Sequence, residues 1–266
     1  MMLRPSPLPL PLTPSGALSQ GPWAVVCGDV HLRVGEVSAF TAFLDRLLLA
    51  PPQHLIILGD LFDYWLDNQS FTRSYESLFV QLHRLHASGV HLHLVLGNRE
   101  LVAGPHLQAA APWRVLRRRL DIECQGRRLR IVHGDRLVRD PGYRFFASVL
   151  ESWWFRAWQA CAPFALHQRI ARLLRAGSQR KGRRNAEIGP PLRLLDPRRV
   201  EAAGRGVQSL IAGHIHQQWH HRIRGIDCHL CGHWEATEGR WLELSTDGGV
   251  QFCQGTFPGL SADVEV

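Results

Sequence analysis

Five apolar runs, each ending in glycine and followed by a polar residue, constrain the fold of this chain more than any other feature. They occupy residues 23–28, 54–59, 90–97, 128–134 and 207–213. Short apolar runs bounded by turn residues are typical of buried strands, and glycine permits a tight turn after each strand. Helical spacing of apolar residues over 37–50, and again at Leu78, Leu82 and Leu85, places helices between the first three runs. The alternation predicts an α/β sandwich with its polar residues on loops at the carboxyl ends of the strands.

The rest of the chain predicts one domain with an insertion. Residues 140–205 contain an aromatic block followed by an arginine-rich block, which we interpret as a helical lid inserted into a domain of residues 21–256. After it, residues 228–230, 240–245 and 249–253 alternate like antiparallel strands that would complete a second sheet. Residues 1–20 are expected to form a disordered proline-rich tail, and residues 257–266 a second tail.

Charge and cysteine content limit the setting in which the protein works. The net charge is +8, and Lys181 is the only lysine, so arginine supplies nearly all of the positive charge. Such a chain attracts phosphate esters, acidic lipid surfaces or nucleic acid. The six cysteines do not form the spaced framework of a secreted disulfide-rich protein, and no apolar run reaches the length of a membrane span. We therefore expect a cytoplasmic protein that is either soluble or bound to a membrane surface.

The polar residues after the five runs are of the types that bind metals. The segments are GDVH at 28–31, GDLFD at 59–63, GNRE at 97–100, HGD at 133–135 and GHIH at 213–216. Carboxylate, amide and imidazole donors together suit Mn, Fe or Zn better than calcium, which takes oxygen ligands. Two such metals about 3.5 to 4 Å apart stabilise an in-line displacement at phosphorus. Five segments in this order therefore predict a two-metal site.

Two other groups of metal-binding residue types have simpler explanations. Isolated histidines such as His54, His91 and His93 are more often core or surface residues than ligands. Cys228 and Cys231 with His233 suggest zinc, but structural zinc sites usually have four ligands with paired spacing. We therefore exclude both groups from the expected site.

The five segments resemble the calcineurin-like metallophosphoesterase family, whose pattern is D-x-H, G-D, G-N-H-[DE], H and G-H-x-H, over about residues 25–241. By position, the resemblance implies that one metal is held by Asp29, His31, Asp60 and His216. It implies that the other is held by Asp60, Asn98, His133 and His214, with Asp60 as the bridge. The third residue of the G-N-H segment is Arg99 in this chain rather than histidine, which argues against a general protein phosphatase.

The arginine is similar to that of one subfamily, the UDP-2,3-diacylglucosamine pyrophosphatases of lipid A synthesis, which carry D-L-H-L, G-D-L-F-E-x-W, G-N-R-D and G-H-T-H. The similarity includes DPGY at 140–143 and the RIA segment that leads to Ser178, and it weakens beyond Ser178. It implies catalytic roles for Asn98 and Arg99, and substrate contacts from Arg99, Asp140 and Ser178. It also implies two divalent metals, with manganese expected and iron or zinc as alternatives. A bridging hydroxide would attack the diphosphate and release UMP and 2,3-diacylglucosamine 1-phosphate.

Alternatives remain open at this point. A soluble metallophosphodiesterase or nuclease would use the same metals, but nucleic-acid binding favours aromatic residues interleaved with basic ones, and here the two kinds form separate blocks. We therefore expect a nucleotide-linked glycolipid substrate and an anionic membrane surface as partners, and no nucleic acid. A non-catalytic scaffold would lack ligands, and none is missing. Trp153, Trp154, Phe155 and Trp158 either face lipid or pack a lid helix onto the core. The oligomeric state stays open.

Overall fold

The computed structural model describes residues 22–100, 103–139 and 191–258. The first of its two sheets has the strand order β11-β10-β1-β2-β3-β4. Strands β1 to β4 run parallel. Strand β10 pairs antiparallel with β1, and β11 pairs antiparallel with β10. The bounds are β1 Ala24–Cys27, β2 His54–Ile57, β3 His91–Val95, β4 Trp113–Leu116, β10 Glu238–Leu244 and β11 Val250–Thr256.

The second sheet has the order β5-β6-β7-β9-β8. Its central strands β6, β7 and β9 run parallel, and the edge strands β5 and β8 are antiparallel to their neighbours. The bounds are β5 Arg119–Cys124, β6 Arg127–Val132, β7 Ser209–Ala212, β8 Gln218–Ile223 and β9 Ile226–Cys231. The two sheets therefore each contain parallel strands whose carboxyl ends can carry a site.

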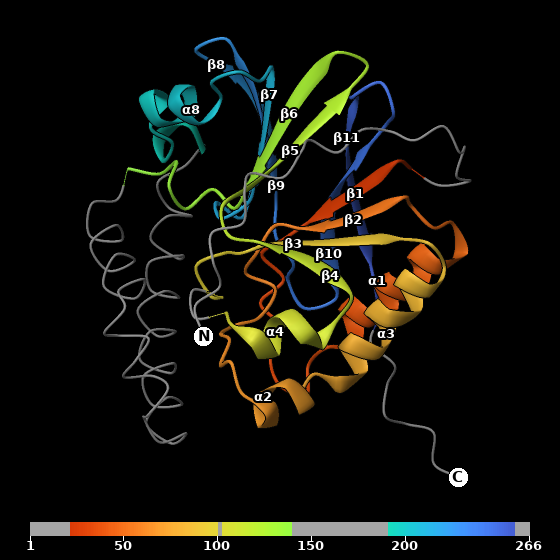
Figure 1. The fold of residues 1–266 in the computed structure, drawn as a ribbon. Helices are drawn as coiled ribbons and strands as arrows, with labels where there is room; N and C mark the ends of the chain where they lie inside the picture. Colours follow the sequence, from red (N-terminus) through yellow and green to blue (C-terminus); the bar gives the residue numbers. More distant parts are fainter. Residues whose placement is uncertain (1–21, 101–102, 140–190, 259–266) are drawn as a thin grey trace.

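Helices cover the outer face of the first sheet. Helices α1 (Ser38–Leu49) and α3 (Glu76–Ala87) pack against each other beneath β1 to β3, as Figure 1 shows. Their buried residues repeat at helical spacing, for example Phe40, Phe43, Leu44 and Leu47 in α1. The shorter helices are α2 (Gln69–Arg73), α4 (Pro105–Ala110), η1 (Pro191–Arg193) and α8 (Pro197–Ala203), and α8 lies beside the second sheet.

The core has two main layers because residues of a strand alternate between its faces. In β1, Val25 and Cys27 pack toward the helices, whereas Ala24 and Val26 pack into the layer between the two sheets. Residues of the second sheet such as Ile131 and Ile211 complete that inner layer. The sandwich thus holds the carboxyl ends of β1, β2, β3, β6 and β7 in a fixed relation.

The fold confirms the predicted α/β sandwich and corrects one detail. Strands were expected at 240–245 and 249–253 in the second sheet, but β10 and β11 join the first. Apolar alternation predicts a strand but does not indicate which strand it pairs with. The choice follows from packing, because Trp241 lies against Phe43 of α1 while Leu242 faces the layer between the sheets. Strands β4, β5 and β8 were not predicted. The sequences of β4 and β8 lack a regular apolar alternation, whereas β5 has one, with Leu120, Ile122 and Cys124 buried.

Some predictions fall outside the described residues. These are the tail at 1–20, most of the tail at 257–266, and residues 140–190 of the expected lid with its aromatic block. Phe257, the first residue of the expected C-terminal tail, is buried against Phe43 and Trp234. Within the described ranges, no helix is long and apolar enough to cross a membrane.

Candidate metal centre and active site

The carboxyl ends of five parallel strands bring together the polar residues that the sequence singles out. Strands β1 to β3 pair in register and end side by side in the first sheet, as β6 and β7 do in the second. The residues that follow these strands are Asp29, His31, Asp60, Asn98, His133, His214 and His216. They form two adjacent clusters of metal-binding side chains, the first donor group (Asp29, His31 and His216) and the second donor group (Asp60, His133 and His214).

The backbone at this site is held in an uncommon conformation. Five of these residues have positive φ, namely Asp29 (51°), His31 (54°), Asp60 (48°), His214 (67°) and His216 (62°). Residues other than glycine rarely adopt such angles, because each costs roughly 1 to 3 kcal/mol and persists only where the surrounding structure enforces it. The strain turns each side chain away from its strand direction and toward the common centre. Such clustering of strained residues is typical of functional sites.

Glycine beside each donor permits close approach of the loops. A Cβ at Gly59 would overlap the backbone of Gly97, and a Cβ at Gly97 would overlap the Asp60 carboxylate. A Cβ at Gly213 would lie 2.5 Å from Asp29 Oδ2. These glycines are therefore required by space as well as by the turns.

In the first donor group, the ligand atoms of the three side chains all lie within 4.8 Å of one another. The Nε2 atoms of His31 and His216 are 3.1 Å apart, and His216 Nε2 is 3.5 Å from Asp29 Oδ1. The Asp29 carboxylate is buried, and its Oδ2 accepts a hydrogen bond from the backbone N–H of His214 at 2.6 Å. Two imidazole nitrogens facing each other beside a buried carboxylate fit a shared cation.

The second donor group has the same chemistry. His133 Nε2 lies 2.8 Å from Asn98 Oδ1, 3.3 Å from His214 Nδ1 and 3.5 Å from Asp60 Oδ1. The other ring nitrogen, Nδ1, lies 2.7 Å from the backbone oxygen of Leu58 and donates to it. In neutral His133 the Nε2 lone pair therefore faces two other acceptors, an arrangement that a cation would stabilise.

The pKa shifts favour an ionised Asp29 and neutral His31 and His214, the forms that bind a cation. Burial alone would raise the pKa of Asp29, but neighbouring histidines, His216 foremost, hold it well below its usual range. Burial lowers the pKa of His31 and of His214 to about 4. Burial would also lower the pKa of His133, but the carboxylates of Asp60 and Asp29 raise it to about 9. A divalent cation would replace the proton that His133 otherwise holds.

Arg99 and Glu100 contact the turns that follow β2 and β3. Arg99 donates through Nη1 to the backbone oxygen of Asp63 at 3.0 Å, and its Nε is 3.6 Å from Asp60 Oδ2. Buried Glu100 accepts backbone N–H groups from Asp60 (2.9 Å), Gly97 (3.1 Å) and Phe62 (3.2 Å). Glu100 therefore ties together the turns after β2 and β3.

Three residues at this site had no role predicted from the sequence. Glu100 and Asp63 stand within the quoted segments, so the available signal was an acidic residue close to the predicted donors. The structure shows that both are buried. His233 stacks on His216 with ring centroids 4.9 Å apart, a contact that no local pattern indicates. Cys231, which with Cys228 and His233 suggested a zinc site, donates a hydrogen bond to the backbone oxygen of Val26. The expected substrate residues Asp140 and Ser178 lie outside the described part of the chain.

A family model supports the interpretation of these segments. The model named calcineurin-like phosphoesterase matches residues 23–234, which include every donor described above. The chain belongs to this family. It is accordingly a metal-dependent hydrolase of the phosphoesterase class.

Three further similarities to known proteins were found. The chain is 32% identical over 210 residues to UDP-2,3-diacylglucosamine hydrolase of Pseudomonas putida (strain W619), covering 75% of this chain and 84% of the relative. It is 29% identical over 206 residues to the hydrolase of the same name from Salmonella paratyphi B, with the same coverage. A solved archaeal phosphodiesterase aligns at 11% identity over 87% of this chain and 99% of its own, with a TM-score of 0.44.

Proposed function

We propose that the two donor groups hold two divalent cations, with the Asp60 carboxylate shared between them. The first cation would be held by Asp29, His31, Asp60 and His216, and the second by Asp60, Asn98, His133 and His214. The position of Asp60 supports this assignment, because its Oδ1 lies 3.5 Å from His133 Nε2. Its carboxylate also acts on His31, where it partly opposes the burial that lowers the pKa of His31 to about 4. The mixed oxygen and nitrogen donors suit manganese, iron or zinc. We propose manganese, which the resemblance to the UDP-2,3-diacylglucosamine pyrophosphatases implies.

We infer that the substrate is UDP-2,3-diacylglucosamine. The observation that carries this inference is Arg99, whose guanidinium lies beside Asp60 at the centre of the site where many family members have histidine. A planar guanidinium suits the oxygens of a diphosphate, which it can bind through two parallel hydrogen bonds. The hydrolase names of the Pseudomonas and Salmonella relatives support the same substrate. One water would be consumed at the diphosphate, giving UMP and 2,3-diacylglucosamine 1-phosphate.

We propose the following roles for the metals and the residues of the site. The two cations, when bound, would lower the pKa of water and neutralise charge on the phosphoryl oxygens. Asn98 would direct its amide oxygen to the second cation, and Arg99 would orient the diphosphate. Asp140 and Ser178 are proposed to contact the substrate, and the aromatic and basic blocks of residues 140–205 to meet the lipid and an anionic membrane surface.

The test is an assay of the purified protein with Mn²⁺ against UDP-2,3-diacylglucosamine and, separately, against a simple aryl phosphodiester. We expect UMP and the lipid phosphate as products, identified by mass spectrometry. Asp60→Ala should abolish both hydrolytic activities, because loss of a shared ligand costs several kcal/mol of transition-state stabilisation. The exposed Asp45→Ala is the matched control.

The outcomes separate the metal site from the substrate. Hydrolysis of the aryl diester without hydrolysis of the glycolipid would refute the proposed substrate and favour a general phosphodiesterase. Retention of more than about a tenth of the rate by Asp60→Ala would refute the metal assignment. A thermal melt of each variant shows whether the fold is kept.

A further inference from the structure

A cavity of about 500 Å³ opens beside the second donor group. His133, a member of the second donor group, and Gly97 are among the residues that line it. The turn between β4 and β5 also lines it, and the C-terminal part of α8 closes it through Ala202 and Ala203. A ligand group in this cavity would therefore lie next to whatever the second donor group holds.

The lining of the cavity is strongly basic. Among the described residues that line it, Asp135 is the only acidic one, and five are arginines: Arg117, Arg118, Arg119, Arg130 and Arg136. Asp121 neutralises part of this charge, because it accepts from Arg130 Nε at 2.7 Å and Nη2 at 3.0 Å and lies 3.7 Å from Arg119 Nε. Counted against Asp121 and Asp135, the five arginines leave an excess of positive charge at the cavity, which attracts a dense anion.

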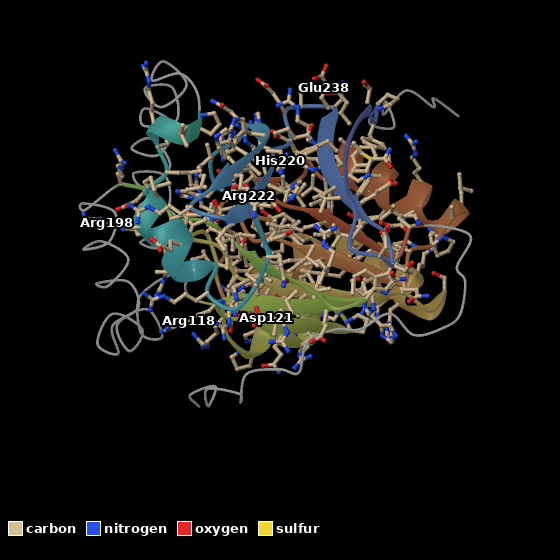
Figure 2. All side chains as sticks on the ribbon, turned by 90° about the horizontal axis from the view of Figure 1, so that it is seen from above. Arg118, Asp121, Arg198, His220, Arg222 and Glu238 are labelled. Atoms are coloured by element: carbon tan, nitrogen blue, oxygen red, sulfur yellow. The ribbon has the colours of Figure 1, made fainter. Side chains whose placement is uncertain are left out.

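Arg118 and Arg136 approach the cavity from two different segments. Arg118 lies in the turn before β5, close in sequence to Asp121, and Figure 2 labels both residues. Arg136 follows His133 in the loop after β6. Both side chains are exposed, so neither is needed to fill the core. Guanidinium groups from two segments around one cavity suit a phosphoryl group, which accepts hydrogen bonds on several oxygens.

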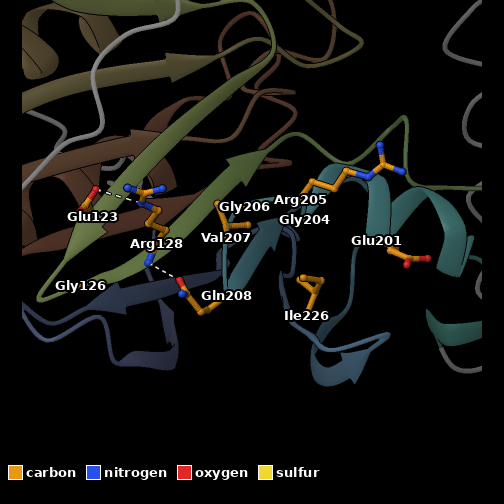
Figure 3. Close-up of a pocket in the computed structure, with 10 residues that line it drawn as sticks. All are labelled: Glu123, Gly126, Arg128, Glu201, Gly204, Arg205, Gly206, Val207, Gln208 and Ile226. Carbon is orange, nitrogen blue, oxygen red and sulfur yellow. Dashed lines mark hydrogen bonds and ion pairs between the residues drawn. The ribbon is translucent and has the colours of Figure 1, made fainter.

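A second cavity of about 560 Å³ provides a contrast (Figure 3). It lies at the amino ends of β6 and β7, the ends of these strands opposite to the donor groups. Its charges are mixed, because Glu123 and Glu201 line it together with Arg128 and Arg205. Arg128 pairs with Glu123 at 3.3 Å. This second cavity has neither the excess of arginine nor the neighbouring donor group.

We propose that the basic cavity beside His133 is the subsite for the second phosphoryl group of a diphosphate, the one that is not held between the two donor groups. The proposal rests on the proposed function, because only a diphosphate places one phosphoryl group at the metals and another directly beside them. Arg118 and Arg136 bind this second group, and Arg99 binds the diphosphate from the side of Asp60. The subsite therefore makes the protein selective for diphosphates over single phosphate esters.

The test compares binding of methylenebisphosphonate, a diphosphate analogue that cannot be hydrolysed, with binding of inorganic phosphate. Affinities are measured by isothermal titration calorimetry on the full chain with saturating Mn²⁺. The double variant Arg118→Gln with Arg136→Gln should weaken bisphosphonate binding at least about tenfold, the scale of one charge-assisted hydrogen bond, and phosphate binding less than about twofold. The control with the same loss of charge is Arg128→Gln with Arg222→Gln, both exposed and outside the cavity.

Each outcome decides the proposal. Selective weakening of the bisphosphonate by the cavity variant supports the subsite. Equal weakening of both ligands, or an effect no larger than that of the control, would overturn it, because either result reports only diffuse positive charge. The single variant Arg118→Gln carries the same test if the double variant does not fold. The measurement needs no turnover, so failure to hydrolyse the glycolipid would refute the proposed substrate without affecting this result.

Discussion

At Arg99, a charged side chain that is largely buried is held in one position by two neighbouring aspartates. Its Nη1 donates to the backbone oxygen of Asp63, and its Nη1 and Nε lie 3.9 Å and 3.6 Å from the carboxylates of Asp63 and Asp60. Its backbone N–H also donates to Asp60 Oδ1 at 2.9 Å. Because a guanidinium is planar with five N–H donors, it can keep these contacts and still present a donor to substrate.

Replacement of Arg99 by lysine should reduce kcat/KM for UDP-2,3-diacylglucosamine by at least about tenfold, the scale of one charge-assisted hydrogen bond. An ammonium keeps the charge but lacks the fork that two acceptors need. Steady-state kinetics with Mn²⁺ measures the effect. Arg33→Lys, at a half-exposed arginine paired only with Glu36 in the described structure, is the control. Equal kcat/KM for Arg99→Lys and the unchanged protein would remove Arg99 from the substrate site.

At the scale of elements, the site depends on how closely the turns after β2 and β3 approach. The backbone of Gly59 (φ +72°) packs against the backbone of Gly97, and Glu100 bridges the two turns through three backbone N–H groups. Parallel strands place these turns side by side, but only residues without a Cβ let them touch. The spacing of Asp60 and Asn98 is therefore set by two glycines rather than by the donors themselves.

Gly59→Ala should destabilise the protein more than Gly206→Ala does. Both glycines have positive φ, +72° and +80°, but a Cβ at Gly206 meets nothing within 4 Å, whereas one at Gly59 overlaps Gly97. Gly206→Ala should cost about 1 to 2 kcal/mol from backbone conformation alone. Gly59→Ala adds an overpacking cost of about 1 to 3 kcal/mol and should also lower Mn²⁺ affinity. Urea denaturation measures the first effect and calorimetric titration the second, and equal stability losses would contradict the steric argument.

At the scale of the whole molecule, the first sheet carries histidines at both ends of its parallel strands. His31, which follows the carboxyl end of β1, belongs to the first donor group. At the amino ends, buried His54 and His93 contact each other, with His54 Nδ1 3.2 Å from His93 Nε2, and His91 stacks on His54. Burial lowers the pKa of His54 to about 4 and that of His93 to about 3. This second cluster therefore links folding to pH without taking part in the site.

The unfolding free energy should fall as the pH falls from about 6.5 to about 4. In this window the unfolded chain protonates His54 and His93 near their ordinary pKa, whereas the folded protein keeps both neutral, so protons favour unfolding. Each histidine contributes up to about 1.4 kcal/mol per pH unit. His54→Gln should flatten the dependence measured by urea denaturation, and the exposed His83→Gln should not. An unchanged slope for His54→Gln would show that His54 is protonated in the folded protein.

Local patterns in the sequence predicted the layers of the fold and the donor side chains that the structure brings together in two groups. Apolar runs that end in glycine are short-range signals, and the five runs became β1, β2, β3, β6 and β7. Parallel strands end at a common edge, so the polar residues after them converge without further information. Patterns did not predict β4 and β8, because neither strand has a regular apolar alternation. They also missed β5, whose alternation of Leu120, Ile122 and Cys124 spans only six residues.

Long-range packing decided what remained. The sheet that β10 and β11 join depends on Trp241 meeting Phe43, a contact between residues about 200 positions apart in the sequence. The cavity beside His133 is formed by segments around residues 118, 136 and 203, and its charge is visible only when they meet. The stacking of His233 on His216 arises in the same way. Sequence patterns report which face of an element is buried, whereas partners across sheets are selected by shape and volume in a close-packed interior, which only the tertiary structure contains.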